Sequence, residues 1–450
     1  MFFKQSLEEY VSKKYNNKFT WFEDEVNEQY SRIADIQNRD MYLNQQIHKI
    51  CSKKNFVWKN KEFKTKKLIL DNVKDVMGFQ STYLLGNKLS FTGDENKLKY
   101  YNKFYKKGNY HKFDKDIVEN GVPYEHVGEY VYIEERNGMK ISKSYMIEPC
   151  DFYPVYTETN DYVAAIEHWI ANGIYYYRVY YEDKVEYWNN EGGELSYIDE
   201  QISITGLPID YKFPNNDFRS LQKLMNEIEY YISKLGDSIQ TIILNPILYN
   251  NGRQLDNDDA QMDKDAVGYL FNTLGGKLDY ANANMDYNTI KLYLNFLIEQ
   301  FYTKAGIPSI VYGQVNIANV SEVSLKLLYQ LADDKATRNE MFFREGLEQR
   351  FEKWDMILEQ QGITLNDEDV DVEINYKRPT NDTELINNLY KQWEMGAIDR
   401  TTIIEKSPLT VNVKQTIERL EEEELKDVKE NNENSGVNDN VNENDEMSLQ

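Results

Sequence analysis

Cysteine is scarce in this 450-residue chain, which contains only Cys51 and Cys150. The two do not form a CxxC pair, no signal-peptide pattern is found, and no apolar run approaches about 18 residues. These absences argue against a disulfide-stapled secreted scaffold and against a membrane-spanning helix. We therefore expect an intracellular, reducing setting.

Positive charge is also in short supply. The chain has 52 Lys and Arg against 76 Asp and Glu, a formal net charge of -24. A protein that grips nucleic acid over its whole surface needs Lys and Arg to neutralise phosphates, so the charge has the wrong sign for that class of protein. Any nucleic acid that this chain meets should be held loosely.

Motifs for catalysis and metal binding are missing. None of the four histidines has a second His or Cys at a metal-ligand spacing, so we interpret them as surface or satisfied structural residues: His48, His111, His126 and His168. "TLGGKLD" lacks the upstream Gly and the Ser or Thr after Lys277 of a phosphate loop, and no GxSxG elbow occurs. The sequence therefore predicts no catalytic residue, no metal and no cofactor, although carboxylates that meet only in the fold would leave no such motif.

An acidic cluster could bind a divalent ion in principle, but it lacks the loop Gly and terminal Glu of a calcium hand. A solvated acidic turn is the favoured interpretation of these residues: Asp256, Asp258, Asp259, Asp263 and Asp265.

Hydrophobic periodicity divides the first half of the chain. Residues 1–120 have mostly helical spacing, including "NQQIHKICSKK" and "TKKLILDNVKDVMGFQSTYLLG". From 125 to 213 the period changes to two, with turn signals at Asn137-Gly138 and Asn172-Gly173. We predict an antiparallel β meander for this second part.

The second half is dominated by helices with clear ends. An apolar stripe from about Asp217 stops at Asn245-Pro246, and a second begins near Asn288 and stops at Gly306. Between them lies a short insert of mixed strand and turn character. The polar stretch "YGQVNIAN" then leads into a long helix with Ser321 as its expected N-cap and Gly362 as its end.

Three passages carry a resemblance to a known family: "PNNDFRSLQKLMNEIEYYISKLGDSIQ", "AGIPSIVYGQVNIANVSEVSLKLLYQLADDKATRNEMFFREGLEQ" and "VEINYKRPTNDTELINNLYKQWEMGAIDRTTIIEKSP". With the order of elements, they resemble the portal proteins of tailed bacteriophages, in particular the type found in siphophages of Gram-positive hosts. The likeness spans nearly the whole chain. It is most specific in the loop with its long helix and in the passage from Arg378 to Ile386.

The resemblance implies an α+β, mainly helical portal fold. Its parts would be a wing (1–216, helical and then a β meander), a first stem helix (217–244), a clip (245–287), a second stem helix (288–305), a tunnel loop (306–321), a long wing helix (322–362), a return strand to the wing (363–380), crown helices (381–420) and an acidic, disordered tail (421–450).

The same resemblance implies a structural protein that is not an enzyme. It would form a ring of about twelve copies at one capsid vertex of the virion, after synthesis in the bacterial host cytoplasm. Double-stranded DNA of any sequence would be packaged and ejected through its centre. The implied partners are terminase, the head-completion or connector proteins, and the major capsid and scaffolding proteins; no membrane is involved.

The residues expected to face the DNA are those of the tunnel loop: Gln314, Val315, Asn316, Asn319 and Ser321. Neutral amides suit a channel through which DNA slides, because each phosphate contact would slow release. Lys291 and Lys304 are candidate cations of the bore, or they face solvent or a neighbouring subunit's carboxylates. Many relatives have Gly or Ala where this chain has Glu322, which points either towards the DNA or across to the next subunit.

Two other classes of protein remain as alternatives. The chain could be a nucleic-acid enzyme or packaging ATPase, against which the absent nucleotide-binding motif argues, or a helical scaffold or adaptor protein.

Overall fold

The computed structural model describes residues 4–58, 61–136, 139–214, 218–239, 247–250, 278–281, 286–308, 322–363, 370–379, 382–410, 412–413, 415–423 and 426. The chain divides into two compact units. Unit 1 comprises residues 1–314 and 330–377, and unit 2 comprises residues 315–329 and 378–450.

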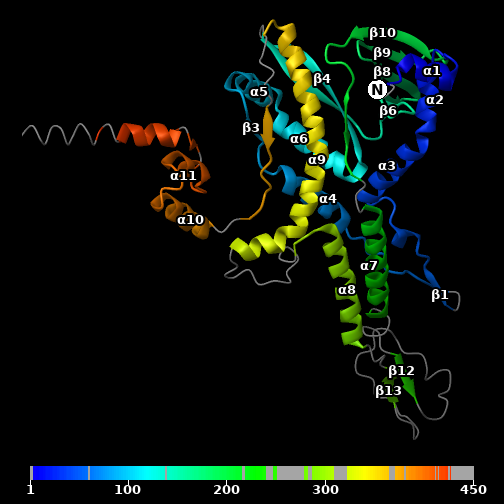
Figure 1. Cartoon of the computed structure of the whole chain (residues 1–450). Helices are drawn as coiled ribbons and strands as arrows, with labels where there is room; N and C mark the ends of the chain where they lie inside the picture. The colour runs from blue at the N-terminus through cyan, green and yellow to red at the C-terminus, as the bar shows by residue number, and fades with distance from the viewer. Residues whose placement is uncertain are drawn as a thin grey trace, which may run out of the picture. The chain divides into compact units, whose positions relative to one another are not determined.

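The fold is α+β and mainly helical, as expected. The helices are α1 (Leu7–Tyr15), α2 (Trp21–Glu28), α3 (Tyr30–Leu43), the 3₁₀ helix η1 (Lys49–Ser52), α4 (Asn72–Leu85), α5 (Glu95–Gly108), α6 (Tyr110–Tyr124), α7 (Phe218–Ser238), α8 (Tyr287–Ala305), α9 (Glu322–Gln360), α10 (Asp382–Glu394) and α11 (Arg400–Lys406). Figure 1 shows α7 and α8 side by side, leaving the body of unit 1 together.

In the part of the chain that the structure describes, the strands form five sheets. They are β1 (Phe56–Trp58), β2 (Lys61–Phe63), β3 (Ser90–Thr92), β4 (His126–Arg136), β5 (Met139–Ile147), β6 (Phe152–Tyr156), β7 (Tyr162–Ala171), β8 (Ile174–Tyr180), β9 (Lys184–Asn189), β10 (Ser196–Ile202), β11 (Ile209–Lys212), β12 (Ile247–Asn250), β13 (Leu278–Ala281) and β14 (Asp371–Glu373). Pairing is antiparallel throughout, and β14 pairs with β3 although about 280 residues separate them.

The single meander predicted for 125–213 is wrong in one respect, because the region forms two sheets. Strands β6 to β10 are the meander, in the order β10-β9-β8-β7-β6, while β11 returns beside β4 to make the sheet β11-β4-β5. Pro154 in β6 gives the physical reason: proline has no N–H to donate to a further strand, so β6 ends its sheet and β5 cannot join it. The turn predicted at Asn172-Gly173 is present between β7 and β8, with φ of 53° and 80°.

The N-terminal region is mostly helical as predicted, and its longest exception within the described residues is 44–70, followed by the short strand β3. "NQQIHKICSKK" contains only the short helix η1, and the hairpin β1–β2 follows it. Leu68 and Ile69, expected in a helix, precede α4. Their segment is extended because backbone N–H groups of this stretch are bonded to side chains of α7 rather than to a helix of their own.

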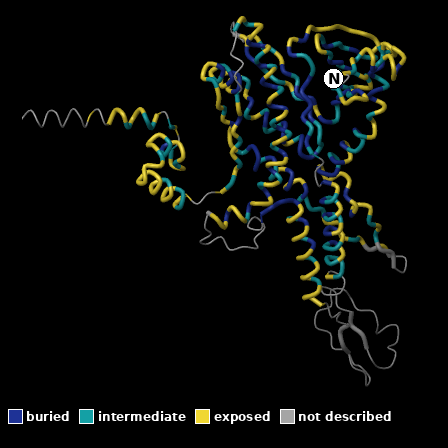
Figure 2. The backbone as a smooth tube through the Cα atoms, in the orientation of Figure 1, coloured by how far each residue is buried: buried dark blue, intermediate teal, exposed yellow. Residues whose placement is uncertain are grey.

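One hydrophobic core lies between helices α1–α3 and one face of the five-stranded sheet. Its buried side chains include Phe22, Ile36, Val155, Ile166 and Trp188. Figure 2 shows buried residues concentrated in the body of unit 1, whereas the exposed fraction rises along α7 and α8. Within the described residues, no helix combines the length and apolar character that crossing a bilayer requires.

Local capping chemistry sets the ends of the last helices of unit 1. Asp286 caps α8, accepting from the backbone N–H groups of Asn288 and Thr289 at 3.1 and 3.2 Å, so this helix begins one residue earlier than predicted. The predicted stops at Gly306 and Gly362 are confirmed, with φ of 71° and 74°. The expected N-cap Ser321 lies outside the described residues.

In unit 2, α10 and α11 follow one another as two short helices, as the sequence predicted. Asp399 caps α11 by accepting from the N–H of Thr402 at 2.7 Å. No residue of α10 is buried, and Ile386, Tyr390 and Trp393 are exposed on it.

Candidate functional site

The helix pair α7 and α8 is the first candidate element. Leu221, Met225 and Ile228 are buried on α7, and Tyr231 meets Tyr293 of α8 edge to face with ring centroids 5.0 Å apart. The C-terminal end of α8 is held to α4, because Gln80 Nε2 donates to the carbonyl of Ala305 at 2.9 Å. The pair is thus fastened to the body at one end.

The segment 66–70 runs along α7 in an unusual ladder. The N–H of Lys66 donates to Asp237 Oδ1 at 2.7 Å, that of Leu68 to Ser233 Oγ at 3.0 Å, and that of Leu70 to Glu229 Oε1 at 2.9 Å. Two residues of extended chain span about 6.6 Å and four residues of helix about 6.0 Å, so alternate amides match every fourth side chain. The hairpin β1–β2 is therefore anchored to α7 at its base.

His48, which directly precedes η1, completes this anchor from the N-terminal side of the hairpin. Its Nδ1 lies 3.0 Å from both oxygens of the buried Glu229, and its Nε2 lies 3.0 Å from the carbonyl oxygen of Tyr42. His48 is accordingly a satisfied structural histidine, as predicted.

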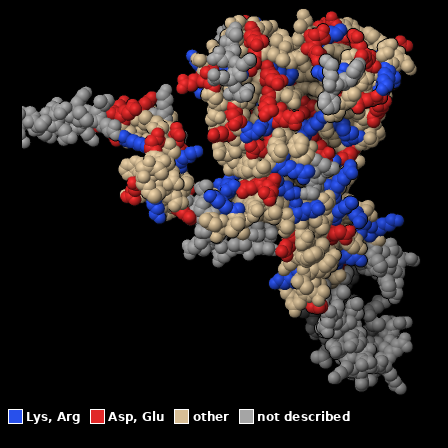
Figure 3. All heavy atoms as spheres, viewed as in Figure 1, with Lys and Arg blue, Asp and Glu red and all other residues tan. Residues whose placement is uncertain are grey.

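Figure 3 shows Lys and Arg gathered on the face in view where α7 leaves the body, whereas Asp and Glu dominate above.

The two lysines proposed for the bore lie on α8, and both are exposed. Thirteen residues separate Lys291 from Lys304, which places them about 140° apart around the helix. They flank the buried stripe of Leu297, Phe301 and Ala305 on its two sides. The two lysines therefore cannot both face the same direction.

The other sequence-predicted site residues fall outside the described part of the chain. This holds for Gln314, Val315, Asn316, Asn319 and Ser321, for the acidic cluster of 256–265, and for the side chain of Glu322. Their placement stays a prediction.

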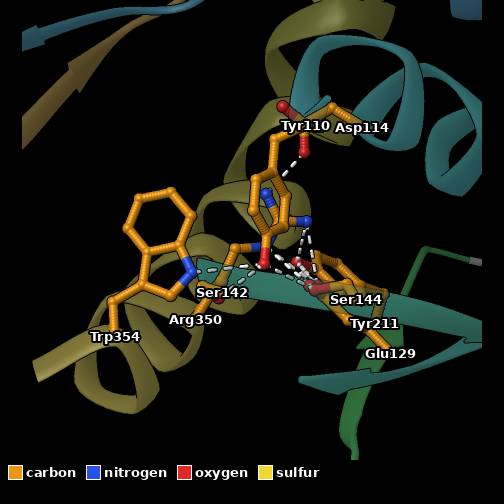
Figure 4. Close-up of polar contacts among 8 residues, drawn as sticks. All are labelled: Tyr110, Asp114, Glu129, Ser142, Ser144, Tyr211, Arg350 and Trp354. Carbon is orange, nitrogen blue, oxygen red and sulfur yellow. Dashed lines mark hydrogen bonds and ion pairs between the residues drawn. The ribbon is translucent and has the colours of Figure 1, made fainter. Parts of the chain in front are cut away.

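A deeply buried group of interacting charges lies elsewhere, around Arg350 of α9. Figure 4 shows its guanidinium between Asp114 of α6 and Glu129 of β4. Nη1 lies 2.5 Å from Asp114 Oδ1, while Nε and Nη2 each lie 2.8 Å from an oxygen of Glu129. Tyr211 of β11 donates to Glu129 at 2.7 Å and accepts from Arg350 Nη2 at 3.0 Å.

Hydroxyl groups complete this network. Ser144 Oγ donates to Glu129 Oε1 and lies 3.0 Å from the hydroxyl oxygen of Tyr110. The Tyr110 hydroxyl accepts from Trp354 Nε1 at 3.4 Å and lies 2.8 Å from Ser142 Oγ. The network thus joins α9 to α6, β4, β5 and β11.

Burial controls the electrostatics of this cluster. Arg350 is 0% exposed, and one positive group meets two carboxyl groups. Desolvation raises the pKa of Asp114, although Arg350 opposes this shift. Desolvation also raises the pKa of Tyr110, to about 12. A cluster as deeply buried as this one holds elements together and offers no access to a substrate.

Lys353 makes a second polar contact one turn further along α9. Its Nζ donates to the carbonyl oxygens of Thr205 and Leu207, each at 2.6 Å. Burial lowers the pKa of Lys353 to about 8. The loop before β11 is thereby fixed to α9.

Two other histidines have structural partners. His126 Nδ1 lies 3.0 Å from Asp210, and His168 Nδ1 lies 2.9 Å from the carbonyl of Tyr176. Burial raises the pKa of the Cys150 thiol to about 11, which disfavours a thiolate nucleophile. In the part of the chain that the structure describes, no three His, Cys, Asp or Glu groups are arranged to hold a metal ion.

Sequence reasoning missed the Arg350 cluster, although a local signal existed. Arg350 falls on the same helical face as Leu347, Phe351 and Trp354, which the apolar spacing assigns to the core. A charged residue on such a face needs buried partners. Asp114 and Glu129, more than 200 residues earlier, carry no signal that identifies them as those partners.

Comparison with known proteins adds independent information. Among solved structures, the chain is similar to a protein in the "Virion of native gene transfer agent (GTA) particle", with 8% identity, a TM-score of 0.43, and coverage of 73% of this chain and 87% of the other. A second similar structure is the "Neck of empty GTA particle computed with C6 symmetry", with 8% identity, a TM-score of 0.43, and coverage of 72% and 89%. No curated protein matches significantly.

A comparison with protein families is decisive. The family described as "Phage portal protein, SPP1 Gp6-like" matches residues 20–430, which is most of the chain. This extent includes the α7–α8 pair, the whole of α9 with Arg350, and α10 and α11. The chain therefore belongs to the SPP1 Gp6-like family of phage portal proteins.

Proposed function

We propose that copies of this chain form a closed ring of about twelve at one capsid vertex, through which double-stranded DNA is packaged and ejected. The observation that carries this proposal is the family match over residues 20–430. The ring is a conduit and a docking platform without an active site. In support, the charges of the Arg350 cluster are buried in the body of the subunit rather than exposed to a substrate.

The parts of the portal are assigned as follows. The body of unit 1 is the wing, α7 and α8 are the stem, the insert with β12 and β13 is the clip, residues 306–321 are the tunnel loop, and residues 381–420 are the crown. The order of the described elements supports this assignment. The clip would meet terminase during packaging and the connector proteins afterwards, while capsid and scaffolding proteins would surround the wing.

The stem helices favour contact with neighbouring copies. Leu292 is 73% exposed and Phe296 is 54% exposed on the face of α8 opposite its buried stripe. Exposed apolar side chains one helical turn apart indicate a surface that is covered in an assembly. Because Lys291 and Lys304 lie about 140° apart on α8, we assign at most one of them to the bore.

Class averages of the negatively stained, purified protein viewed along the ring axis test the ring directly. We expect closed rings with a central opening, and a mass measurement that gives a multiple of the 53.3 kDa chain. A protein that stays monomeric in all conditions would refute the proposal. Nucleotide turnover that is lost on substitution of one specific carboxylate would instead support the packaging-ATPase alternative.

Deletion of Val315–Asn319 tests the tunnel loop. We expect the ring to assemble and DNA packaging or retention to be impaired, because the deletion shortens the loop that is proposed to meet the DNA. Normal full-length packaging by this variant would contradict the loop assignment while leaving the ring intact.

A further inference from the structure

One segment of this acidic chain is strongly basic. Residues 49–67, which we call the basic hairpin, contain eight lysines and one glutamate, a formal charge of +7. The remaining residues must then sum to -31, since the whole chain carries -24. The segment comprises η1, β1 and β2, and Figure 1 shows it leaving the side of α7.

The base of the basic hairpin is fixed on both sides to one carboxylate. Lys53 Nζ lies 2.7 Å from Asp237 Oδ2 on the incoming side, and the N–H of Lys66 donates to Asp237 Oδ1 on the outgoing side. Lys53 also lies over the ring of Tyr230, 5.9 Å from its centroid, and Lys234 lies 5.7 Å from the same centroid. The arm is therefore held in a defined direction before it meets any partner.

Beyond this base, several lysines are not used within the subunit. Lys54 and Lys64 are exposed, and neither has a carboxylate within 4.0 Å among the described residues. A two-stranded hairpin alone is marginally stable in water, so an arm of this kind gains stability from a partner. The uncommitted charge requires that partner to be acidic.

We infer that the basic hairpin docks on an acidic surface of the adjacent copy of this chain in the ring, an inference that rests on the proposed function. Charge complementarity favours this occupant, because each copy presents -31 outside its hairpin. Strands β1 and β2 also contain Phe56, Trp58 and Phe63. Protein interfaces are enriched in aromatic residues, whereas contacts to DNA phosphates need only cations and hydrogen-bond donors.

This docking also answers a problem of assembly. Subunits of formal charge -24 repel one another in a ring, and the repulsion is strongest at low salt, where the Debye length is long. A +7 arm on the neighbour replaces part of that repulsion by attraction. The attraction is screened by salt, so the arm's contribution to assembly falls as the salt concentration rises.

The double variant Lys54→Glu/Lys64→Glu tests the docking in the full-length protein. At 0.05 M salt we expect half-assembly to require about tenfold more protein than the wild type, since two reversed exposed charges together cost roughly one factor of ten. The difference should shrink towards 0.5 M salt, by which point the Debye length is about 4 Å. Mass photometry or sedimentation velocity over a protein dilution series measures the half-assembly concentration.

The matched control is Lys99→Glu/Lys103→Glu on α5. Both lysines are exposed and helical, and the double substitution changes the net charge by the same amount. We expect this control to assemble like the wild type. If both double variants form rings as readily as the wild type, the docking is overturned and the proposed ring stands. If the wild-type chain never assembles, both are overturned.

Two further measurements identify the occupant. In rings reconstituted from ¹⁴N- and ¹⁵N-labelled protein, carbodiimide should join Lys54 or Lys64 of one label to Asp or Glu peptides of the other; crosslinks confined to one label would contradict the docking. Fluorescence anisotropy with a short DNA duplex tests the alternative, in which the basic hairpin contacts DNA. If Lys54→Glu/Lys64→Glu weakens DNA binding and leaves assembly unchanged, the hairpin is a DNA contact and the inference is wrong.

Discussion

Replacing Arg350 by Ala should destabilise unit 1 far more than replacing Arg344, which lies on the same helix. Both arginines have two carboxylate partners, but Arg350 is 0% exposed, whereas Arg344 is 31% exposed and pairs with an Asp371 side chain that is 78% exposed. Loss of one partner from a buried ion pair costs about 3–5 kcal/mol, because the other charge is left buried and unpaired. An exposed pair contributes about 1 kcal/mol or less.

The comparison translates into melting temperatures. At about 2 °C per kcal/mol for a large domain, Arg350→Ala should lower the Tm by about 6 °C or more, and Arg344→Ala by about 2 °C or less. Thermal unfolding followed by circular dichroism measures both. All variants need the same protein concentration and assembly state, since binding between copies also shifts the Tm.

A rescue experiment separates charge from packing. Arg350→Met combined with Glu129→Gln removes the cation and its main carboxylate together, so part of the lost stability should return. Equal Tm shifts for Arg350→Ala and Arg344→Ala would refute the assignment of the cluster as a buried charge anchor. Failure of the double variant to recover any stability would show that the guanidinium acts mainly through its shape.

Two other predictions concern α9. A Cβ at Gly346 would lie 2.1 Å from the ring of Tyr211, so Gly346→Ala should lower the free energy of unfolding in urea by about 1–3 kcal/mol. The control is Gly78→Ala on α4, where a Cβ would have nothing within 4 Å, and it should be neutral or stabilising by up to about 1 kcal/mol. Equal effects of the two substitutions would contradict the close approach of Tyr211 to Gly346. The pKa of Lys353 falls from 10.5 to about 8 on folding, so between these pH values the unfolded state binds more protons than the folded state. The stability of the wild type relative to Lys353→Met should therefore rise from pH 8 to 9.5, by at most about 1.4 kcal/mol per pH unit. Urea titrations measure this difference, and a flat or falling difference would contradict the burial of the ammonium group.

Local chemistry was readable from the sequence where one residue decides the outcome. Gly306 and Gly362 end their helices because each adopts a positive φ that other residues avoid, and Asn172-Gly173 makes the turn between β7 and β8 for the same reason. The periodicities of α8 and α9 predicted their positions to within one or two residues. In all these cases the cause lies within a few residues of the effect.

What the sequence did not predict depends on distant partners. The stretch 66–70 has helical spacing, yet it is extended because acceptors on α7, about 160 residues later, bind its amides. The pairing of β14 with β3 and of Arg350 with Asp114 is likewise decided by the tertiary fold. Local propensity is a weak guide wherever such contacts compete with it.

The axial position of α9 against the body is specified twice, by charge and by shape. A slip of one turn, about 5.4 Å, would carry Arg350 away from the carboxylate of Glu129 and leave buried charges unpaired. The same slip would place Phe342 or Arg350 opposite Tyr211, where only Gly346 leaves room for the ring. Tyr211 takes part in both constraints, so they are coupled rather than independent. Arg350→Ala should still leave the steric fit at Gly346 to oppose the slip, and Gly346→Ala should still leave the charge pairing to oppose it. Only loss of both the charge pairing and the steric fit would allow the part of α9 that lies in unit 1, residues 330–360, to occupy another register against the body.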